Sequence, residues 1–497
     1  MTQLPSKLSS GDTTFPTDSS ADSCCLALAS ALGVKVSFPG AQTYHASLGS
    51  YFSLQNSTLK PRCIVSPTSA EDVRTAITTL ASTSEALPAE EKPRAHFAIR
   101  SGGHAPFAGA ANIPDGITLD LRALNTIRVS DDRTTVSVGV GATWGEVYAH
   151  LDPLRLSVAG GRAAQVGVGG LTTGGGISYF SPRYGWTCDT VLNFEVVLAD
   201  GSIVNANETQ NPDLMVALRG GSSNFGVVTR VDLMAFEQGP VWGGTLYHAI
   251  ETVEQHLEAF VEFNSAERYD EFASLITSFG FAGGRGSAVV NNLEYTKDEV
   301  NPPVFRPFTA IPALFSTMRT AQMHEIAMEQ GAFQQNGKRQ LSVVTTHGST
   351  LPILKAVYSR WDSSLEVVRD IPGIVWSISL EPLPPAIYAR NHSKNAMGLS
   401  DATGALVVTL LSATWEDDAD DAKVEKAARE LFDNIDSDAR NLDVYEPFVY
   451  LNYAAPWQNP LASYKSKSVE RLQRVSQDVD PKGLFRSNVP GGFKLPV

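Results

Sequence analysis

Two glycines and a histidine, Gly102, Gly103 and His104, follow directly after the apolar stretch HFAIRS. Glycine lets the backbone approach another group closely or turn with a positive φ, which residues that carry a Cβ resist. The histidine then lies at the mouth of that turn, where a strand gives way to a loop. One interpretation is a tight turn whose histidine finds a hydrogen bond. The other is a loop that admits a cofactor, so that His104 touches it or is bonded to it.

A second glycine-rich stretch, GGRAAQVGVGGLTTGGGIS, covers residues 160–178. A dinucleotide-binding Rossmann loop has Gly-x-Gly-x-x-Gly between a strand and a helix, with an acidic residue about 20 positions further on. Asp189 lies at about that separation, but no strand precedes it, so the match is weak. Two glycine clusters this close, interleaved with core-type Val, Leu and Ile, predict instead a long loop along an extended ligand, with backbone N–H groups facing a pyrophosphate.

The elements that must position these loops alternate between strands and helices. Helices are expected at 22–32, 68–80 and 143–151, with strands at RCIVSP, HFAIRS, GITLDLR, TTVSVGVGAT and FGVVTRVDLMAF and a hairpin formed by VLNFEVVL and IVNAN. This predicts an α+β domain. In the middle of the chain, the strands GGTLYHAI, IVWSISLEP and ALVVTLLSATW and the helices VEQHLEAFVEFNS and DDAKVEKAARELFDNI predict an antiparallel sheet backed by helices. Residues 1–20 are expected to be a disordered leader.

The composition excludes several classes of protein. With 497 residues, 43% of them hydrophobic and 19% charged, the chain has the balance of a globular protein of two or three domains. A net charge of −14 argues against a nucleic-acid partner, which needs clustered Lys and Arg. No apolar run approaches the ~20 residues of a membrane span. The compartment stays open: three glycosylation sequons fit a secreted protein whose signal peptide was removed, and otherwise the protein is cytoplasmic.

The four cysteines have no metal-ligand spacing, so no metal site is expected. Cys63 can pair with either of the adjacent Cys24 and Cys25, and the sequence does not decide which. Cys188 is a further thiol.

Four runs in chain order resemble a known family: RSGGHAPFAGAANIPDGITLDLRALN, VGVGGLTTGGGISYFSPRYGW, NFGVVTRVDL and YLNYAAP. They resemble the FAD-linked oxidases of the vanillyl-alcohol-oxidase fold, in particular the berberine-bridge-enzyme-like flavoproteins. The resemblance is strong over about 25–240 and clear from 446 onward, whereas the middle diverges. It implies a two-part FAD-binding domain of the PCMH type, 21–237 with the C-terminal segment 446–497 returning to it. The substrate-binding domain is then 238–445.

The resemblance also assigns roles around FAD. It implies a covalent bond from a ring nitrogen of His104 to the 8α-methyl of the flavin. Many members form a second bond through a cysteine, where this chain has Ala163, so a single link and a lower flavin potential are expected. Val166 leaves room for O2 near the flavin. The implied cofactor-binding residues are Arg100, Ser101, Gly102, Gly103, His104, Gly109, Val166, Gly167, Gly170, Gly174, Gly175, Gly176, Gly226, Val228, Asn452 and Tyr453.

Three residues are candidates for catalysis. Tyr450 is the first choice as base, which requires neighbouring cations or donors to lower its pKa. Tyr184 matches a tyrosine that lines the site in relatives. Glu381 lies on a predicted strand, with Ser379 on the same face, and is either a buried base or an ordinary surface glutamate.

The expected function is that of a monomeric FAD-dependent oxidase. It would transfer a hydride from a C–OH or activated C–H of a small secondary metabolite or sugar to flavin N5, and O2 would reoxidise the flavin to give H2O2. A carbohydrate oxidase, a non-redox cyclase on the same fold and a flavin-binding protein without catalysis are the alternatives.

Overall fold

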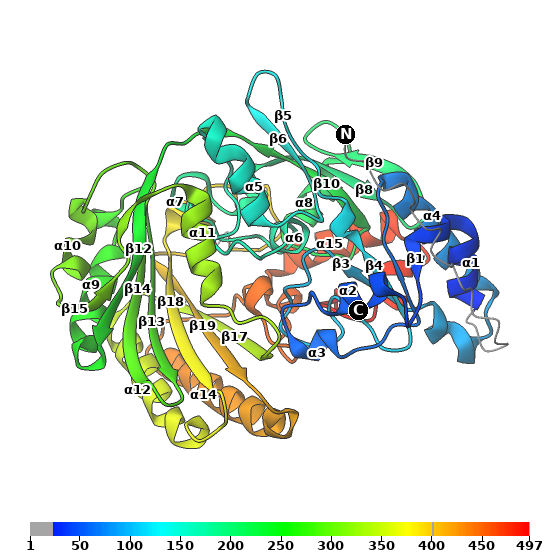
Figure 1. Cartoon of the computed structure of the whole chain (residues 1–497). Coiled ribbons are helices and arrows are strands. Elements are labelled where there is room, and N and C mark those ends of the chain that lie inside the picture. The colour runs from blue at the N-terminus through cyan, green and yellow to red at the C-terminus, as the bar shows by residue number, and fades with distance from the viewer. Residues whose placement is uncertain (1–22, 400–401, 497) are drawn as a thin grey trace, which may run out of the picture.

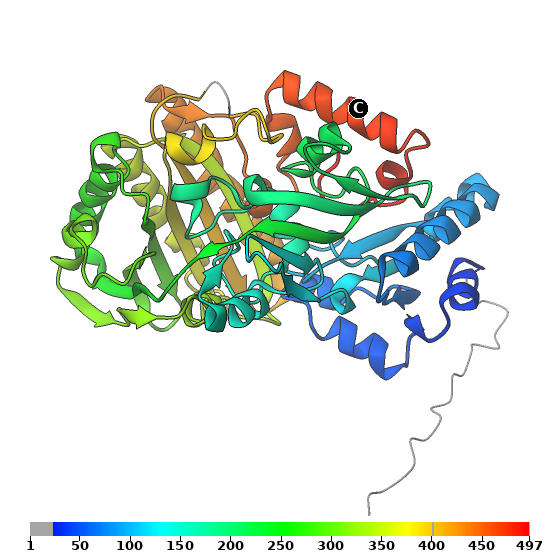
Figure 2. The same ribbon diagram turned by 90° about the horizontal axis from the view of Figure 1, so that it is seen from above.

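The computed structural model describes residues 23–399 and 402–496, so the expected leader 1–20 lies outside the described residues. The fold is α+β, as predicted. Figure 1 shows a wide antiparallel sheet on the left and two smaller sheets with their helices on the right. The C-terminal segment, in red, runs back among the elements on the right, and the view from above in Figure 2 agrees.

Two small sheets form the first part of the molecule. One has the order β1-β2-β4-β3, in which β2 and β3 each run parallel to β4, and the other is the antiparallel sheet β5-β6-β10-β8-β9. A further pair joins β7 and β11. Their bounds are β1 (Val36–Ser37), β2 (Cys63–Val65), β3 (Phe97–Arg100), β4 (Ile117–Asp120), β5 (Ile127–Val129), β6 (Thr135–Gly139), β7 (Leu156–Ser157), β8 (Val191–Val197), β9 (Ile203–Ala206), β10 (Val227–Met234) and β11 (Phe236–Glu237).

Two helices of this part, α4 and α5, begin at side-chain caps. The longest starts after Ser69, whose hydroxyl accepts the N–H of Asp72, and it continues to Ala86, six residues beyond the expected end. Thr143 and Glu146 form a capping box for the helix that precedes the glycine-rich stretch. The helices are α1 (Ser23–Leu32), α2 (Gln42–Leu48), α3 (Leu54–Ser57), α4 (Ala70–Ala86), α5 (Trp144–Leu151), α6 (Val168–Thr173), α7 (Ser181–Tyr184) and α8 (Pro212–Leu218), with α15 (Ser466–Val479) and α16 (Leu484–Ser487) from the C-terminal segment.

A large antiparallel sheet dominates the middle of the chain, with the order β15-β12-β14-β13-β18-β19-β17-β20 and β16 beside β12. Its strands are β12 (Val241–Ala249), β13 (Ala273–Ala282), β14 (Gly286–Tyr295), β15 (Ala313–Ser316), β16 (Arg319–Ala321), β17 (Arg339–Gly348), β18 (Val375–Leu383), β19 (Leu406–Trp415) and β20 (Tyr445–Glu446). The accompanying helices are α9 (Val253–Phe263), α10 (Arg306–Thr309), α11 (Met323–Ala332), α12 (Leu351–Val368), α13 (Pro385–Tyr388) and α14 (Asp421–Asn441). The sequence analysis names β12, β18, β19, α9 and α14 but misses β13, β14 and β17, whose mixed polar and apolar residues lack a clear period.

The two faces of this sheet differ in chemistry. One face packs Phe279, Leu380 and Leu411 into a core shared with α9, α12 and α14. The opposite face carries polar side chains at alternate positions: the hydroxyls of Ser278 and Ser379, paired in register, hydrogen-bond at 2.7 Å. Because side chains alternate along a strand, Glu381 lies on this polar face with Ser379, as expected from the sequence.

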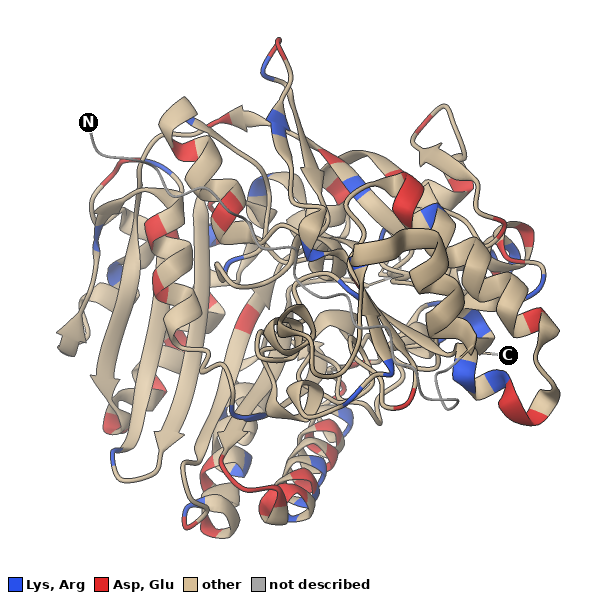
Figure 3. Cartoon of the chain, turned by 45° about the vertical axis from the view of Figure 1, so that its right-hand side comes forward, with Lys and Arg blue, Asp and Glu red and all other residues tan. Residues whose placement is uncertain are grey.

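The C-terminal segment completes the other core. Phe448, Tyr464 and Phe485 belong to the same apolar cluster as the small sheets, which explains why 446–497 lies with the first part of the chain. Charged side chains gather on outer elements such as α14, where Figure 3 shows both signs interspersed. Among the described residues, no helix is long and apolar enough to cross a membrane.

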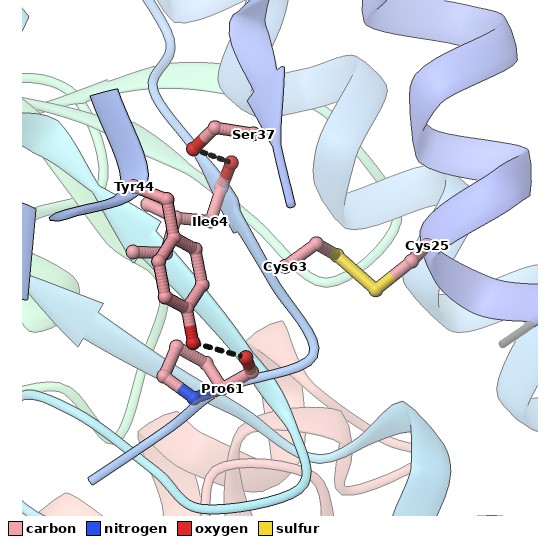
Figure 4. The surroundings of a disulfide bond; sticks show 6 residues. All are labelled: Cys25, Ser37, Tyr44, Pro61, Cys63 and Ile64. Atoms are coloured by element: carbon pink, nitrogen blue, oxygen red, sulfur yellow. Dashed lines mark hydrogen bonds between the residues drawn. A yellow bond between two sulfur atoms is a disulfide. The ribbon is translucent and has the colours of Figure 1, made fainter. Parts of the chain in front are cut away.

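A disulfide between Cys25 and Cys63 ties α1 to β2 (Figure 4), which decides between the two pairings that the sequence allows. Tyr44 and Ser37 bind the backbone of the same strand segment, through the carbonyls of Pro61 and Ile64. Cys188 is buried and lies outside this bond.

Removing this disulfide with Cys63→Ser is expected to lower the free energy of unfolding by about 2–4 kcal/mol, since the bond closes a loop of 38 residues in the unfolded chain. Denaturant unfolding of the variant and of the wild type, with and without reductant, measures the difference. Reductant should destabilise the wild type alone. Equal sensitivity of both proteins would contradict the assignment.

Candidate active site

The two glycine-rich loops pack backbone against backbone. A Cβ on Gly102 would lie 2.7 Å from the Cα of Gly167, and one on Gly167 would lie 2.3 Å from the nitrogen of Gly102, distances that real Cβ atoms do not show. Gly103 has a φ of +73°. Glycine is therefore required here by close approach and by conformation, and it brings the start of α6 to the end of β3.

Arg100 and Ser101 hold this junction together. The Arg100 guanidinium is fully buried: it donates to the carbonyls of Ser47 and Ser50 and stacks on the ring of Tyr51. Its side chain therefore holds the chain around residue 50, and a contact of Arg100 with the cofactor stays a prediction. The Ser101 hydroxyl donates to the Val140 carbonyl at 2.6 Å and accepts the Gly169 N–H at 3.1 Å, which links β3 to α6.

His104 lies half-buried beyond this junction. Its ring stacks on Phe52 with centroids 4.0 Å apart, and its Nε2 lies 2.8 Å from Oε1 of Gln334. Burial lowers the pKa of His104 to about 4, against the smaller opposite effect of the Gln334 hydrogen bond. The imidazole is therefore neutral at physiological pH and retains a nucleophilic nitrogen.

The triple glycine meets the C-terminal YLNY motif. A Cβ on Gly174 would lie 2.1 Å from Oδ1 of Asn452, and one on Gly175, whose φ is +107°, would lie 3.4 Å from the Tyr450 ring. The Asn452 amide donates to the Leu171 carbonyl and to the Tyr450 hydroxyl. The triple glycine and the YLNY motif, which are almost 280 positions apart in the sequence, thus lie in direct contact.

Five other residues are expected at the cofactor: Gly109, Val166, Gly170, Gly226 and Val228. Gly109 has a φ of +88° and open space on its Cβ side, and Gly170 on α6 is exposed with equally open space. Val166 is half-buried beside the α5 start, where its carbonyl accepts the Trp144 N–H. Gly226 directly precedes β10, and Val228 lies within β10 and pairs with Val196 of β8. Their contact with a cofactor stays a prediction.

A buried ion pair joins the two parts of the molecule. Nη2 of Arg162, from the glycine-rich stretch, donates to Oε2 of Glu381 at 2.8 Å and to the Tyr453 hydroxyl at 2.5 Å. The Tyr453 hydroxyl in turn donates to Oε1 of Glu381 at 3.1 Å. Arg162 is 8% exposed and Glu381 3%. Glu381 is therefore not a surface glutamate, since the structure places its carboxylate in a closed triad.

The structure changes the expectation for Tyr450. The ring is buried and stacks on Trp186 at 5.4 Å. Burial raises the pKa of Tyr450, and the Asn452 hydrogen bond and Arg162 offset only part of that rise. A tyrosine base needs a lowered pKa, so this environment is the opposite of the one expected. Tyr184 makes other contacts, stacking on Phe236 with Arg183 over its ring.

Comparisons with known proteins agree with this geometry. A family model described as an FAD binding domain matches residues 61–207. The chain is 38% identical over 490 residues to the FAD-dependent monooxygenase CTB5 of Cercospora beticola, covering 95% of this chain and 92% of that protein. The chain belongs to the FAD-dependent oxidoreductases.

Two further similarities accompany this membership. A solved structure of a berberine bridge enzyme variant in complex with (S)-reticuline superposes with a TM-score of 0.74 at 17% identity, covering 95% of this chain and 98% of that one, and thus shares the fold. A Diaporthe leptostromiformis protein named Oligopeptidase PhomG' is 43% identical over 477 residues. The match covers 94% of this chain but only 37% of the length of that relative.

The residues of this flavoprotein fit FAD at the glycine-rich loops. Among the described residues, the hydroxyl of Thr172 on α6 and the side-chain carbonyl of Gln165 are buried without a hydrogen-bond partner. An unpaired buried polar atom is costly, so such atoms mark a place where a polar ligand belongs. The exposed Gly170 lies on the same short helix as Thr172. The loops around Gly102 and Gly167 would hold the pyrophosphate, and His104 would lie beside the isoalloxazine.

Two alanine substitutions test this fit. Gly102→Ala is expected to lower the free energy of unfolding of the FAD-free protein by about 1–3 kcal/mol, because the backbone of Gly167 cannot yield. Gly170→Ala should not lower that stability, since nothing lies within 4 Å of the new Cβ and alanine favours the helix, yet it should reduce the FAD content of the flavoprotein. Full FAD content in Gly170→Ala would show that this face does not meet the cofactor.

Sequence reasoning missed Arg162 and Gln334. Arg162 stands next to Ala163 in the glycine-rich stretch 160–178. An arginine in such an apolar run is unusual and could have marked a buried functional residue. Gln334 lies in a polar segment, AFQQNGK, that carries no signal at all.

Proposed function

We propose that the protein is an oxidase that binds FAD covalently through His104 alone and oxidises a C–OH or activated C–H of a small secondary metabolite. The observation that supports this best is the buried Arg162–Glu381–Tyr453 triad, which joins the FAD-binding loops to the sheet of the substrate domain. When bound, FAD supplies the hydride acceptor and delivers the two electrons to O2, giving H2O2.

Glu381 is the proton acceptor in this proposal. A substrate hydroxyl that reaches Tyr453 would give its proton to the Tyr453 oxygen while Tyr453 passes its own proton to Oε1 of Glu381, 3.1 Å away. The Arg162 charge stabilises the carboxylate before transfer and the tyrosine oxygen during it. Tyr450 then has a positioning role, holding Asn452 against the triple glycine.

Ala163 and Val166 bear on the cofactor and its acceptor. Ala163 has no nucleophile, so one covalent link is proposed instead of two, with a flavin potential below that of doubly linked relatives. Valine at 166 is small enough to leave room for O2.

A monooxygenase is the second candidate, because a relative with 38% identity bears that name. The two activities differ in the fate of dioxygen: an oxidase releases both atoms as H2O2, whereas a monooxygenase places one atom in the product. A non-redox cyclase on the same fold would consume no dioxygen, and a carbohydrate oxidase would differ only in substrate.

The deciding experiment mixes the purified protein with a panel of phenolic alcohols and sugars, first without oxygen and then with isotopically labelled O2. Bleaching of the flavin without oxygen, followed by one H2O2 for each product molecule and an unlabelled product, supports the oxidase. Label in the product supports the monooxygenase. Product formed without bleaching or O2 uptake supports the cyclase.

A further inference from the structure

The segment around Gln334 connects the substrate domain to the His104 loop. It follows α11, and its next residues bind the chain beside His104: the Gly337 N–H donates to the Phe52 carbonyl and the Leu54 N–H donates to the Lys338 carbonyl. The Phe52 N–H in turn donates to the Gly103 carbonyl. Phe52 thus contacts the imidazole by stacking, and Gln334, an exposed residue, contacts it by a hydrogen bond.

The hydrogen bond engages one of the two ring nitrogens, since Oε1 of Gln334 lies 2.8 Å from Nε2 of His104. An amide oxygen can only accept, so in this orientation of the amide Nε2 carries the proton. In a neutral imidazole the other nitrogen, Nδ1, then holds the free lone pair. Phe52, which stacks on the ring, and Gln334, which hydrogen-bonds to it, are both uncharged and do not favour the imidazolium.

We propose that Gln334 positions His104 for its attachment to FAD, by engaging Nε2 in a hydrogen bond that orients the ring and leaves Nδ1 to form the bond. This inference rests on the proposed covalent link through His104 and extends it to the atom that reacts and the residue that prepares it. Gln334 is a positioning residue that acts through the histidine.

The attachment is balanced as follows. A bond forms between Nδ1 and the 8α carbon, and one C–H bond of that methyl group breaks. The carbon loses its hydrogen as a proton, and the imidazole loses the proton on Nε2. The two electrons released are taken up by dioxygen, which is reduced with these two protons to H2O2.

An amide suits both states of the histidine. Before attachment, Nε2 is a donor and Gln334 accepts; afterwards Nε2 has no proton and must accept. Half a turn of the Gln334 amide brings its NH2 group to that nitrogen, so one side chain serves both states. Glutamate could only accept, and leucine could do neither.

The test follows the rate of attachment in full-length protein produced under riboflavin starvation and then given FAD. Samples are precipitated with acid at intervals, and flavin is measured in pellet and supernatant. Gln334→Leu should attach flavin about tenfold more slowly, the effect of losing one positioning hydrogen bond. Gln335→Leu is the matched control, because it removes the neighbouring exposed glutamine, and it should match the wild type.

Gln334→Glu adds a readout that a purely structural role would not change. A carboxylate beside the ring favours the imidazolium, which has no lone pair on Nδ1. Attachment in this variant should slow as the pH falls from about 8 to about 6. The wild type should show no such slowing, because its His104 stays neutral down to a pKa of about 4.

The outcomes separate the two proposals. Wild-type attachment in Gln334→Leu would overturn the role of Gln334 and leave His104 as the attachment site. Equal slowing in Gln334→Leu and Gln335→Leu would also overturn it, because the segment and not the hydrogen bond would then matter. Wild-type flavin that stays in the acid supernatant would overturn the covalent link itself and this inference with it.

Discussion

Replacing His104 by alanine is expected to move all of the flavin from the acid-precipitated pellet to the supernatant. Alanine has no nucleophile, and Ala163 stands where relatives carry the cysteine of a second link, so no other bond is proposed to hold FAD. The loops around Gly102 and Gly167 remain intact in the variant and should still bind FAD without a bond. Absorbance of pellet and supernatant after precipitation measures the effect directly.

His150→Ala serves as the control for this substitution, since it removes an exposed histidine from α5. It should keep all flavin in the pellet, like the wild type. Pellet-bound flavin in His104→Ala would mean that another residue forms the bond. Cys188 is the buried thiol to examine in that case.

Glu381→Gln is expected to slow flavin reduction by about 10²–10⁴-fold, the usual range for loss of a general base. The amide keeps the shape of the side chain but cannot take the proton that Tyr453 passes on. Stopped-flow bleaching under anaerobic conditions measures the rate, and the FAD content of the variant shows whether the site is still formed. Reduction at the wild-type rate would exclude Glu381 as the proton acceptor.

The Arg162–Glu381 ion pair also allows an effect on stability to be distinguished from an effect on catalysis. Arg162→Met leaves a buried carboxylate unpaired, which is expected to cost about 3–5 kcal/mol in the free energy of unfolding. The double variant Arg162→Met with Glu381→Leu should recover part of this loss, because an apolar pair needs no charge partner. The recovery stays incomplete because the Tyr453 hydroxyl loses both of its hydrogen-bond partners. The double variant should nevertheless reduce flavin no faster than Glu381→Gln. Recovered turnover in the double variant would assign the triad a structural role only.

Much of the local structure could be predicted from the sequence. The strands that alternate polar and apolar residues, such as β6 and β18, and the capped helices α4 and α5 were expected close to their observed positions. The two glycine-rich loops were also predicted from the sequence, because a close approach such as that of Gly102 and Gly167 tolerates no other residue. The long strands β13, β14 and β17 were missed because polar residues such as Thr277 and Asn291, paired in register, share a face with the core residue Phe279 and interrupt the expected alternation.

The sequence by itself determined the α+β fold class and the two glycine-rich loops, because each depends on residues within a few positions of one another. The nomination of His104 came from the resemblance of four runs along the chain to a known flavoprotein family. Only the tertiary structure decided which residues act together: Arg162 with Glu381, His104 with Gln334, and Cys25 instead of Cys24 with Cys63. These partners lie 219, 230 and 38 positions apart. Burial also decided the state of each group, lowering the pKa of His104 and raising that of Tyr450. Such effects depend on what the folded chain packs around a side chain, which local sequence does not encode.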